Sequence, residues 1–157
     1  MRFPKLFCGF LLGLAACTSP NLNVFEKNVT IPGQTWHYDL RPSVQFNVTD
    51  TNAAYSVSVV CRHTDAYAYK NLWVLIATRK PGDSAFRRDR FELTLQDNSG
   101  HWYGTGMDDI WEQRIPLYTD PIHFSKTGTY IVQFEQNMRD NPLKGILDIG
   151  LRVEKTP

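Results

Sequence analysis

Alternation of apolar and polar residues is the feature that most constrains how this chain can fold. In residues 44–48, Val44, Phe46 and Val48 alternate with polar side chains. A period of two places the apolar side chains on one face of a β-strand and the polar ones on the other. The same pattern recurs at 55–59, 91–96, 130–135 and 147–154. The chain is therefore expected to form sheets with one buried face and one face in water.

The stretch Asn71–Thr78 departs from this alternation because it is apolar on both faces, with Trp73 and Leu75 opposite Leu72 and its neighbours. A central strand covered on both sides explains that composition best. Turn-forming runs such as Asp97-Asn98-Ser99-Gly100 separate the stretches, and no window shows a helical stripe. The sequence predicts an all-β fold: an antiparallel β-sandwich in a single domain, with a jelly roll as one form of it.

The N-terminal residues have the order of a bacterial lipoprotein signal. A basic start precedes the apolar stretch Leu6–Ala16, and Cys17 follows two alanines. This order is typical of a secretory signal, and the stretch is shorter than the roughly 20 residues that a membrane-spanning helix needs. The run Leu14-Ala15-Ala16-Cys17 resembles the lipobox, whose cysteine thiol takes a diacylglycerol before cleavage and whose new amine is acylated afterwards.

Cys17 is therefore the expected lipid attachment site, with a diacylglycerol on its thiol and an acyl chain such as palmitate on its amine. Three chains should hold the protein to a membrane, since each buried methylene contributes about 0.8 kcal/mol. We expect a signal peptide at 1–16, a lipid anchor and tether at 17–35, and the sandwich at 36–157. The alternative is a soluble secreted protein in which the cysteine has no such role.

Loss of the signal peptide would remove Arg2 and Lys5, which leaves 15 basic residues against 16 acidic ones. This balance gives no electrostatic reason to expect a nucleic-acid partner. Cys61 would remain as the only unmodified cysteine, so the mature chain could form no intrachain disulfide. We expect Cys61 to be a buried, inert thiol, with a reactive thiol as the alternative.

Residues 99–112 hold the densest group of candidate functional side chains, since three glycines, three aromatic residues and three carboxylates lie close together. The candidate interaction residues are Trp102, Tyr103, Asp108, Asp109 and Trp111. We favour a glycine-rich loop that folds its tryptophans over the end of the sandwich and presents acids to water. Such a loop could contact another protein.

Asp108, Asp109 and Glu112 also raise two chemical alternatives, calcium binding and glycoside hydrolysis. Their spacing matches no calcium loop, and no second carboxylate pair stands out. The Gly-x-Gly at 104–106 is not followed by a helix, so it is not a phosphate loop.

No nucleophile or metal motif accompanies the loop. No serine lies in a Gly-x-Ser-x-Gly elbow, and the histidines are scattered without the close spacing of zinc ligands. We expect each of them to be a polar strand or loop residue: His37, His63, His101 and His123. The sequence therefore predicts a protein that is not an enzyme and needs no cofactor apart from its covalent lipid.

Carbohydrate binding is the alternative function, because sandwiches often bind sugars on aromatic platforms. The candidate rings are Trp36, Trp73, Trp102, Tyr103 and Trp111. Two coplanar rings open on one face would favour sugar binding, whereas buried rings would favour a role in the core.

Three longer stretches resemble the gliding-motility lipoprotein H (GldH) family of Bacteroidetes. They are "NLWVLIATRKP" at 71–81, "DNSGHWYGTGMDDIWEQRIPL" at 97–117 and "GTYIVQFEQNMRDNPLKGILDIGLRVEK" at 128–155. Together with the signal, the resemblance covers essentially the whole chain. It implies an envelope lipoprotein associated with gliding and its linked secretion machinery, and it implies no reaction, cofactor or known ligand. Cys17 alone carries over as a functional residue.

The resemblance also implies a membrane contact through the lipid and partners among envelope or gliding-machinery proteins. Thr18 follows the cysteine where inner-membrane lipoproteins of enteric bacteria have Asp, which favours the outer membrane. The stretch Thr18–Val24 contains no acidic residue, which favours the periplasmic face over the cell surface in this phylum.

Overall fold

The computed structural model describes residues 24–156, so Cys17 and the predicted signal peptide lie outside the described residues. Regular structure in this part of the chain is β-strand, except for one 3-10 turn, η1 (Pro32–Gln34). The strands are β1 (Val24–Thr30), β2 (Thr35–Trp36), β3 (Ser43–Val48), β4 (Tyr55–Thr64), β5 (Asn71–Arg79), β6 (Arg87–Thr94), β7 (Thr105–Met107), β8 (Ile110–Pro116), β9 (Gly128–Gln136), β10 (Leu143–Lys144) and β11 (Ile146–Lys155).

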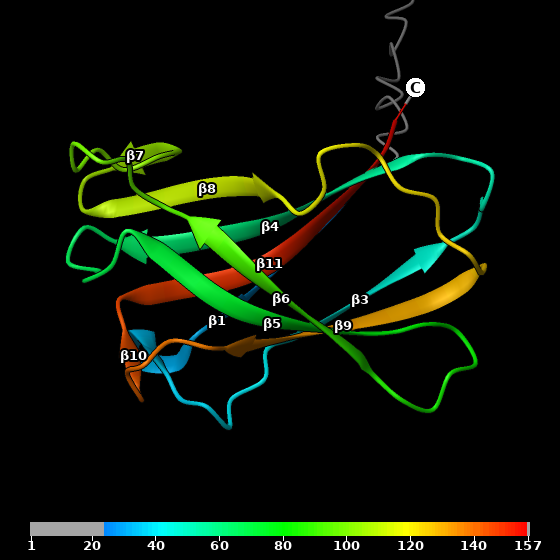
Figure 1. Ribbon diagram of the computed structural model, residues 1–157, viewed down its shortest axis with the longest axis horizontal. Helices are drawn as coiled ribbons and strands as arrows, with labels where there is room; N and C mark the ends of the chain where they lie inside the picture. The colour runs from blue at the N-terminus through cyan, green and yellow to red at the C-terminus, as the bar shows by residue number, and fades with distance from the viewer. Residues whose placement is uncertain (1–23, 157) are drawn as a thin grey trace, which may run out of the picture.

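The strands form two main antiparallel sheets (Figure 1). One has the order β1-β11-β4-β8-β7, the other has the order β3-β9-β5-β6, and β2 pairs with β10 at the side. If the short β2, β7 and β10 are left out, eight strands remain and can be counted in chain order. The first, eighth, third and sixth of them then form one sheet, and the second, seventh, fourth and fifth form the other. This is the strand order of a jelly roll, so the predicted antiparallel sandwich is confirmed in its jelly-roll form.

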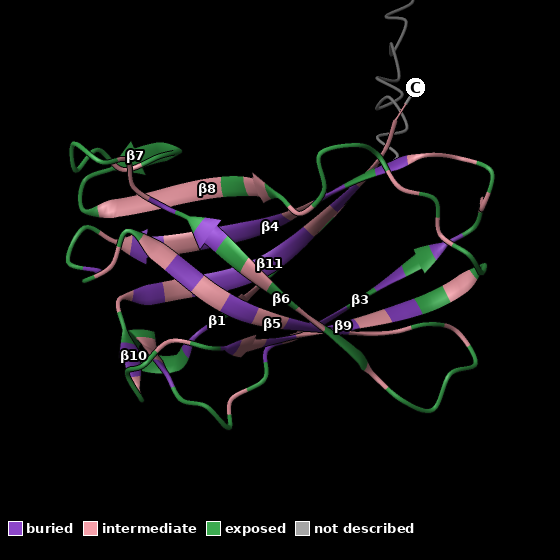
Figure 2. Ribbon diagram, viewed as in Figure 1, coloured by how far each residue is buried: buried purple, intermediate pink, exposed green. Residues whose placement is uncertain are grey.

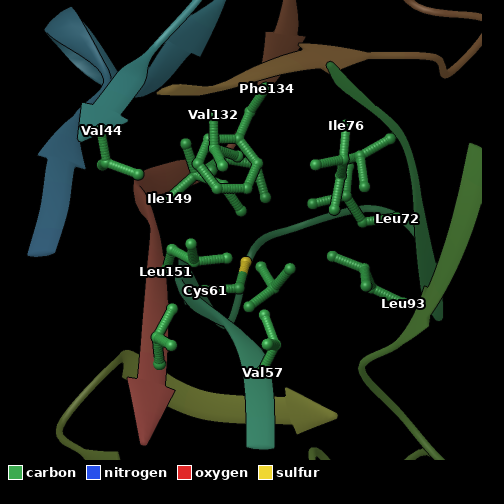
Figure 3. Close-up of a cluster of buried hydrophobic side chains, with 14 of the residues drawn as sticks. Val44, Val57, Cys61, Leu72, Ile76, Leu93, Val132, Phe134, Ile149 and Leu151 are labelled. Atoms are coloured by element: carbon green, nitrogen blue, oxygen red, sulfur yellow. The ribbon is translucent and has the colours of Figure 1, made fainter. Parts of the chain in front are cut away.

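The core lies between the two sheets and is built from the alternating apolar positions (Figure 3). Val44, Phe46 and Val48 are buried in β3, whereas Gln45 and Asn47 between them are exposed. The same alternation buries one face of β9 and of β4. The period-two reading is therefore confirmed for the strands that cross the core.

The sandwich begins earlier than the predicted boundary at residue 36. Residues 24–30, which we assigned to the tether, pair with β11 as the edge strand β1. Ile31 and Trp36 are then buried in the core. β1 shows little alternation in its sequence because, as an edge strand, it buries none of its residues fully. The predicted tether at 17–35 is therefore too long at its C-terminal side.

Two further expectations need correction. In β11 we placed Leu147 on the same face as Ile149, but a register shift between Ile146 and Asp148 makes Leu147 an extra, half-buried residue. Such a bulge lets Ile146 point into the core instead.

β5 lies inside its sheet as predicted, but within residues 24–156 no second layer covers its outer face. Leu72, Val74 and Ile76 are buried, whereas Trp73 and Leu75 are only half-buried (Figure 2). The prediction of full cover on both sides of this strand is therefore wrong for the outer face.

The two ends of the sandwich carry different elements. Val24 pairs with Glu154, and Lys155 pairs with Tyr55, so both ends of the described chain lie at one end of the sandwich, which we call the Val24 end. Ile110 at the start of β8 pairs with Thr64, the last residue of β4. The β7–β8 hairpin therefore lies at the opposite end, which we call the far end (Figure 1).

Candidate functional site

The predicted interaction loop forms a hairpin at the far end. Met107 pairs with Ile110, so Asp108 and Asp109 make a two-residue turn in which Asp108 has a φ of +55°. The backbone oxygen of Asp109 accepts a hydrogen bond from the N–H of Asp65 at 2.8 Å, which ties the hairpin to the end of β4. Both turn carboxylates are exposed. The hairpin thus presents its acids to solvent, as we expected.

Two glycines let this loop lie directly on β8. Gly104 has a φ of +89°, and a Cβ atom there would overlap the backbone oxygen of Glu112. A Cβ atom at Gly106 would come within 2.8 Å of the Trp111 ring. Because only glycine permits both approaches, these positions serve the packing of the loop and not the binding of a phosphate.

Trp102 closes the far end of the core. Its ring centroid lies 4.6 Å from that of His63 and 6.5 Å from that of Tyr67. Trp111 is half-buried on the neighbouring strand. Trp102 therefore packs against the core as predicted, whereas the Trp111 ring lies against Gly106 of the same hairpin. Tyr103 is the aromatic residue of the loop that stays exposed.

His63 lies on a strand, β4, as expected, but its burial was not anticipated. It is fully buried, its Nδ1 lies 2.8 Å from the oxygen of Thr64, and its Nε2 has no hydrogen-bond partner among residues 24–156. Burial lowers the pKa of His63 below its ordinary value. The available signal was the inward register of Val59 and Cys61 in the same strand, which puts position 63 on the buried face.

The carboxylates of the loop do not converge on a metal or a substrate. Glu112 points along the sheet surface, where Arg62 lies 3.8 Å away and Arg114 3.6 Å away. Asp108 and Asp109 instead stand at the hairpin tip. In the part of the chain that the structure describes, no group of three or more His, Cys, Asp or Glu residues could hold a metal ion.

Glu112 belongs to a chain of ion pairs across the outer face of the five-stranded sheet. The pairs join Asp148 to Arg62 (2.7 Å), Arg114 to Glu26 (3.2 Å), Arg152 to Glu26 (2.8 Å) and Arg152 to Glu154 (2.9 Å). The hydrogen bonds from Arg114 and then Arg152 hold the pKa of Glu26 below its ordinary value. This face therefore neutralises its own charges.

The five candidate rings for sugar binding do not form a platform. Trp36 is fully buried, and Trp73 lies on the other sheet from Trp111. Among the described residues no two of the five rings contact each other as an aromatic pair. The exposed tyrosines 38, 103 and 118 belong to separate segments. The arrangement matches the criterion for core aromatics better than that for a sugar platform.

Cys61 is buried, as predicted, and burial raises the pKa of its thiol to about 12. Since the thiolate is the reactive form, this thiol is inert at neutral pH. Cys17, the predicted lipid site, lies outside the described residues. No helix within residues 24–156 has the length and apolar character needed to span a membrane.

The fold and its surfaces define a jelly-roll domain whose candidate site is an exposed hairpin and not a cleft. The chain belongs to the GldH lipoprotein family, whose model matches residues 23–153. It is 29% identical over 140 residues to the gliding motility lipoprotein GldH of Flavobacterium johnsoniae, which covers 84% of each chain. It is 28% identical over 128 residues to the gliding motility lipoprotein GldH homolog of Christiangramia forsetii, which covers 77% of this chain and 78% of the relative. No solved structure matches the chain. The family resemblance of the sequence is thereby confirmed.

Proposed function

We propose that this protein is an envelope lipoprotein of the gliding-motility apparatus and its linked secretion machinery, with a structural or interaction role. The match of the GldH lipoprotein model to residues 23–153 carries the proposal, since the relatives above bear the name of gliding motility lipoproteins. In this account the lipid on Cys17 anchors the protein, and the sandwich contacts other envelope proteins.

The chain length between anchor and domain decides which end faces the membrane. Val24 comes seven residues after Cys17, and seven residues reach at most about 25 Å. The Val24 end of the sandwich then faces the membrane, and the far end with its hairpin points away from it. Thr18 and the acid-free stretch that follows favour the periplasmic face of the outer membrane.

The hairpin offers side chains suited to contact with a protein. Met107 is 74% exposed and directly precedes the acids of the turn, and Tyr103, at the base of the hairpin, is 44% exposed. Aromatic residues and Met are enriched in protein interfaces. Since β8 and Gly104 hold the loop in place, a partner would meet a preformed surface.

The contacts of the loop carboxylates support a non-catalytic role. Glu112 pairs with Arg62 at 3.8 Å and with Arg114 at 3.6 Å, whereas Asp108 and Asp109 are exposed at the hairpin tip. A general acid is usually buried, and none of these three carboxylates is.

The test is a crosslinking pull-down of the tagged, lipidated protein from its own envelope, with mass spectrometry of what is recovered. We compare the wild type with the double variant Tyr103→Ala, Met107→Ala. Tyr118→Ala is the matched control, because Tyr118 is also 44% exposed but lies beyond β8, toward the Val24 end.

The proposal predicts that gliding or secretion components are recovered with the wild type and the control. Their recovery should fall about tenfold in the double variant, which is the usual effect of removing an aromatic hot spot. Equal recovery in all three proteins would contradict the role of the hairpin. Recovery of glycan fragments in place of proteins would favour carbohydrate binding.

A further inference from the structure

The outer face of the four-stranded sheet combines an apolar centre with four arginines, three of which have no acidic partner among residues 24–156. We call it the arginine face, and it comprises Trp73, Leu75, Arg79, Arg88, Arg90 and Arg139. The first five residues lie on β5 and β6, and Arg139 lies just after β9. This face is separate from the hairpin at the far end and from the ion-paired face of the other sheet.

The apolar centre of this face lacks a cover. β5 has the composition of a strand that is buried on both sides, yet Trp73 and Leu75 are only half-buried. A hollow of about 350 Å³ lies beside Trp73, between Tyr69 and Met138. The N–H of Trp73 donates a hydrogen bond to the sulfur of Met138 at 3.2 Å, which fixes one wall of this hollow. It can take an apolar side chain from another molecule.

The arginines on this face are oriented but not neutralised. The guanidinium of Arg90 lies 4.0 Å from the centroid of the Trp73 ring, and that of Arg79 lies 5.0 Å from the Phe86 ring. Stacking of this kind fixes the guanidinium plane and leaves its N–H groups to bind carboxylates in pairs. Within residues 24–156, Arg79, Arg90 and Arg139 have no ion-pair partner.

The neighbouring charges leave this excess in place. Arg88 and Arg41 share one carboxylate, that of Glu135, at 3.1 and 3.6 Å. Glu92, which lies opposite Trp73 on the same face, accepts a hydrogen bond from Asn71 and pairs with none of the arginines of this face. On the opposite face of the molecule, by contrast, Arg62 and Arg114 each contact carboxylates of their own sheet. The positive excess is therefore a property of the arginine face and not of the whole protein.

We propose that the arginine face docks a partner protein through an acidic segment that also carries an apolar side chain. The carboxylates of that segment would pair with Arg90 and Arg139, and its apolar side chain would enter the hollow beside Trp73. Charge complementarity sets the chemistry of the partner, and Trp and Arg are the residues that most often dominate such interfaces. Because Arg90 lies over the Trp73 ring, one face of that ring is already occupied, which disfavours its use as a stacking platform for a base or a sugar. The inference goes beyond the proposed function, since it depends neither on the hairpin nor on the identity of the apparatus.

The test is site-specific photo-crosslinking of the full-length protein in its own envelope. A photoreactive residue replaces Gln133, which lies on the outer face of β9 opposite Ala77 of β5. Ser58 on the outer face of β4 is the matched position on the other sheet. The crosslinked peptides are then sequenced by mass spectrometry.

The proposal predicts a protein crosslink at position 133 through a segment rich in Asp and Glu, and none at position 58 to the same segment. Arg90→Glu with Arg139→Glu should lower its yield about tenfold or more. Lys144→Glu reverses one exposed positive charge on β10, as Arg139→Glu does on the arginine face, and it should leave the yield unchanged. Exchange of an acidic residue of the captured segment for Lys should restore the crosslink to the doubly reversed protein.

The single variant Arg139→Glu controls for a folding defect in the double variant, because the Arg139 side chain is exposed on the loop after β9. It should still reduce the crosslink. An unchanged yield in both arginine variants would overturn the proposal. So would a crosslink to a neutral or basic segment, to lipopolysaccharide or to a second copy of this chain, or the absence of any protein crosslink at position 133.

Discussion

His63 shows how one buried side chain gives the fold a dependence on pH. Burial lowers its pKa below the ordinary value of 6.5, so the folded protein holds the ring neutral while the unfolded chain takes up a proton near pH 6.5. The free energy of unfolding should therefore be highest above pH 6.5, where the ring is neutral in both states. It should fall as the pH drops toward the pKa of His63 in the folded protein. The slope of one such proton is at most about 1.4 kcal/mol per pH unit.

Urea unfolding at several pH values between 7 and 5 measures this slope, with His63→Gln as the comparison. The variant should be less stable overall but should show a flatter profile. The range excludes most carboxylate titration, since the shifted carboxyls have pKa values below their ordinary range. An identical slope in both proteins would show that another group carries the dependence.

Substitutions at Gly104 and Asp108 distinguish a packing role from a chemical role in the hairpin. Gly104→Val forces a β-branched residue into positive φ and overlaps the backbone of Glu112, so we expect a loss of about 3 kcal/mol or more. Asp108→Asn keeps a residue that tolerates positive φ at an exposed position, and it should change stability by less than about 0.5 kcal/mol. Urea midpoints of the two variants test this order. A larger loss for Asp108→Asn would mean that its carboxylate has a role beyond the turn.

At the scale of the elements, Asp148 ties three strands of one sheet together. From β11 its carboxylate accepts a hydrogen bond from Thr30 of β1 and forms an ion pair with Arg62 of β4, each at 2.7 Å. The residue is 7% exposed, whereas Thr30 is exposed and Arg62 is half-buried, so Asp148→Ala removes a buried charged acceptor from two donors that water can reach. We expect a loss of about 1–3 kcal/mol.

Glu154→Ala provides the control, because Glu154 pairs with Arg152 at 2.9 Å near the edge of the same network, where it is 44% exposed. Exposed pairs contribute about 0–1 kcal/mol. Chemical denaturation of both variants decides between them. If both lost the same stability, burial of Asp148 would not be the factor that matters.

The elements that could be predicted from the sequence are those whose burial has a regular period. β3, β4 and β9 alternate cleanly because each crosses the core with one face in water. The hairpin could be anticipated from its glycines and acids. β1 could not, because an edge strand needs no apolar face to pair its backbone.

Other features escaped prediction because they depend on contacts between distant residues. The bulge at Leu147 is set by the register of β11 against β4, which local sequence does not encode. Likewise, the pattern of β5 shows that Trp73 and Leu75 are apolar, but not that the second cover is missing. The ion network also joins residues more than eighty positions apart, such as Arg62 and Asp148.

At the scale of the whole molecule, the surfaces divide by charge and position. The outer face of the five-stranded sheet neutralises itself, the arginine face does not, and the hairpin lies at the end away from Val24. A lipid at Cys17 would fix which of these surfaces a partner in the envelope can reach. In the proposed function, a lipid anchor would therefore determine which of these surfaces is used.

Cys17→Ser tests whether the anchor governs location without affecting the fold. Since the serine hydroxyl cannot form the thioether, we expect an uncleaved or mislocalised precursor in membrane fractionation. The sandwich should still fold, because the described strands that form it span Val24–Lys155. Cys8→Ser, a change within the predicted signal peptide, is the matched control and should leave fractionation unchanged. Wild-type fractionation of Cys17→Ser would argue against lipidation.

The most direct test of the central claim is the mass of the N-terminal peptide of the protein purified from its own membrane. The account predicts a peptide that begins at Cys17 and carries a diacylglycerol on the thiol and an acyl chain on the amine. A mature chain that begins elsewhere, or a Cys17 with a free thiol, would contradict the claim that this protein is a lipid-anchored member of its family.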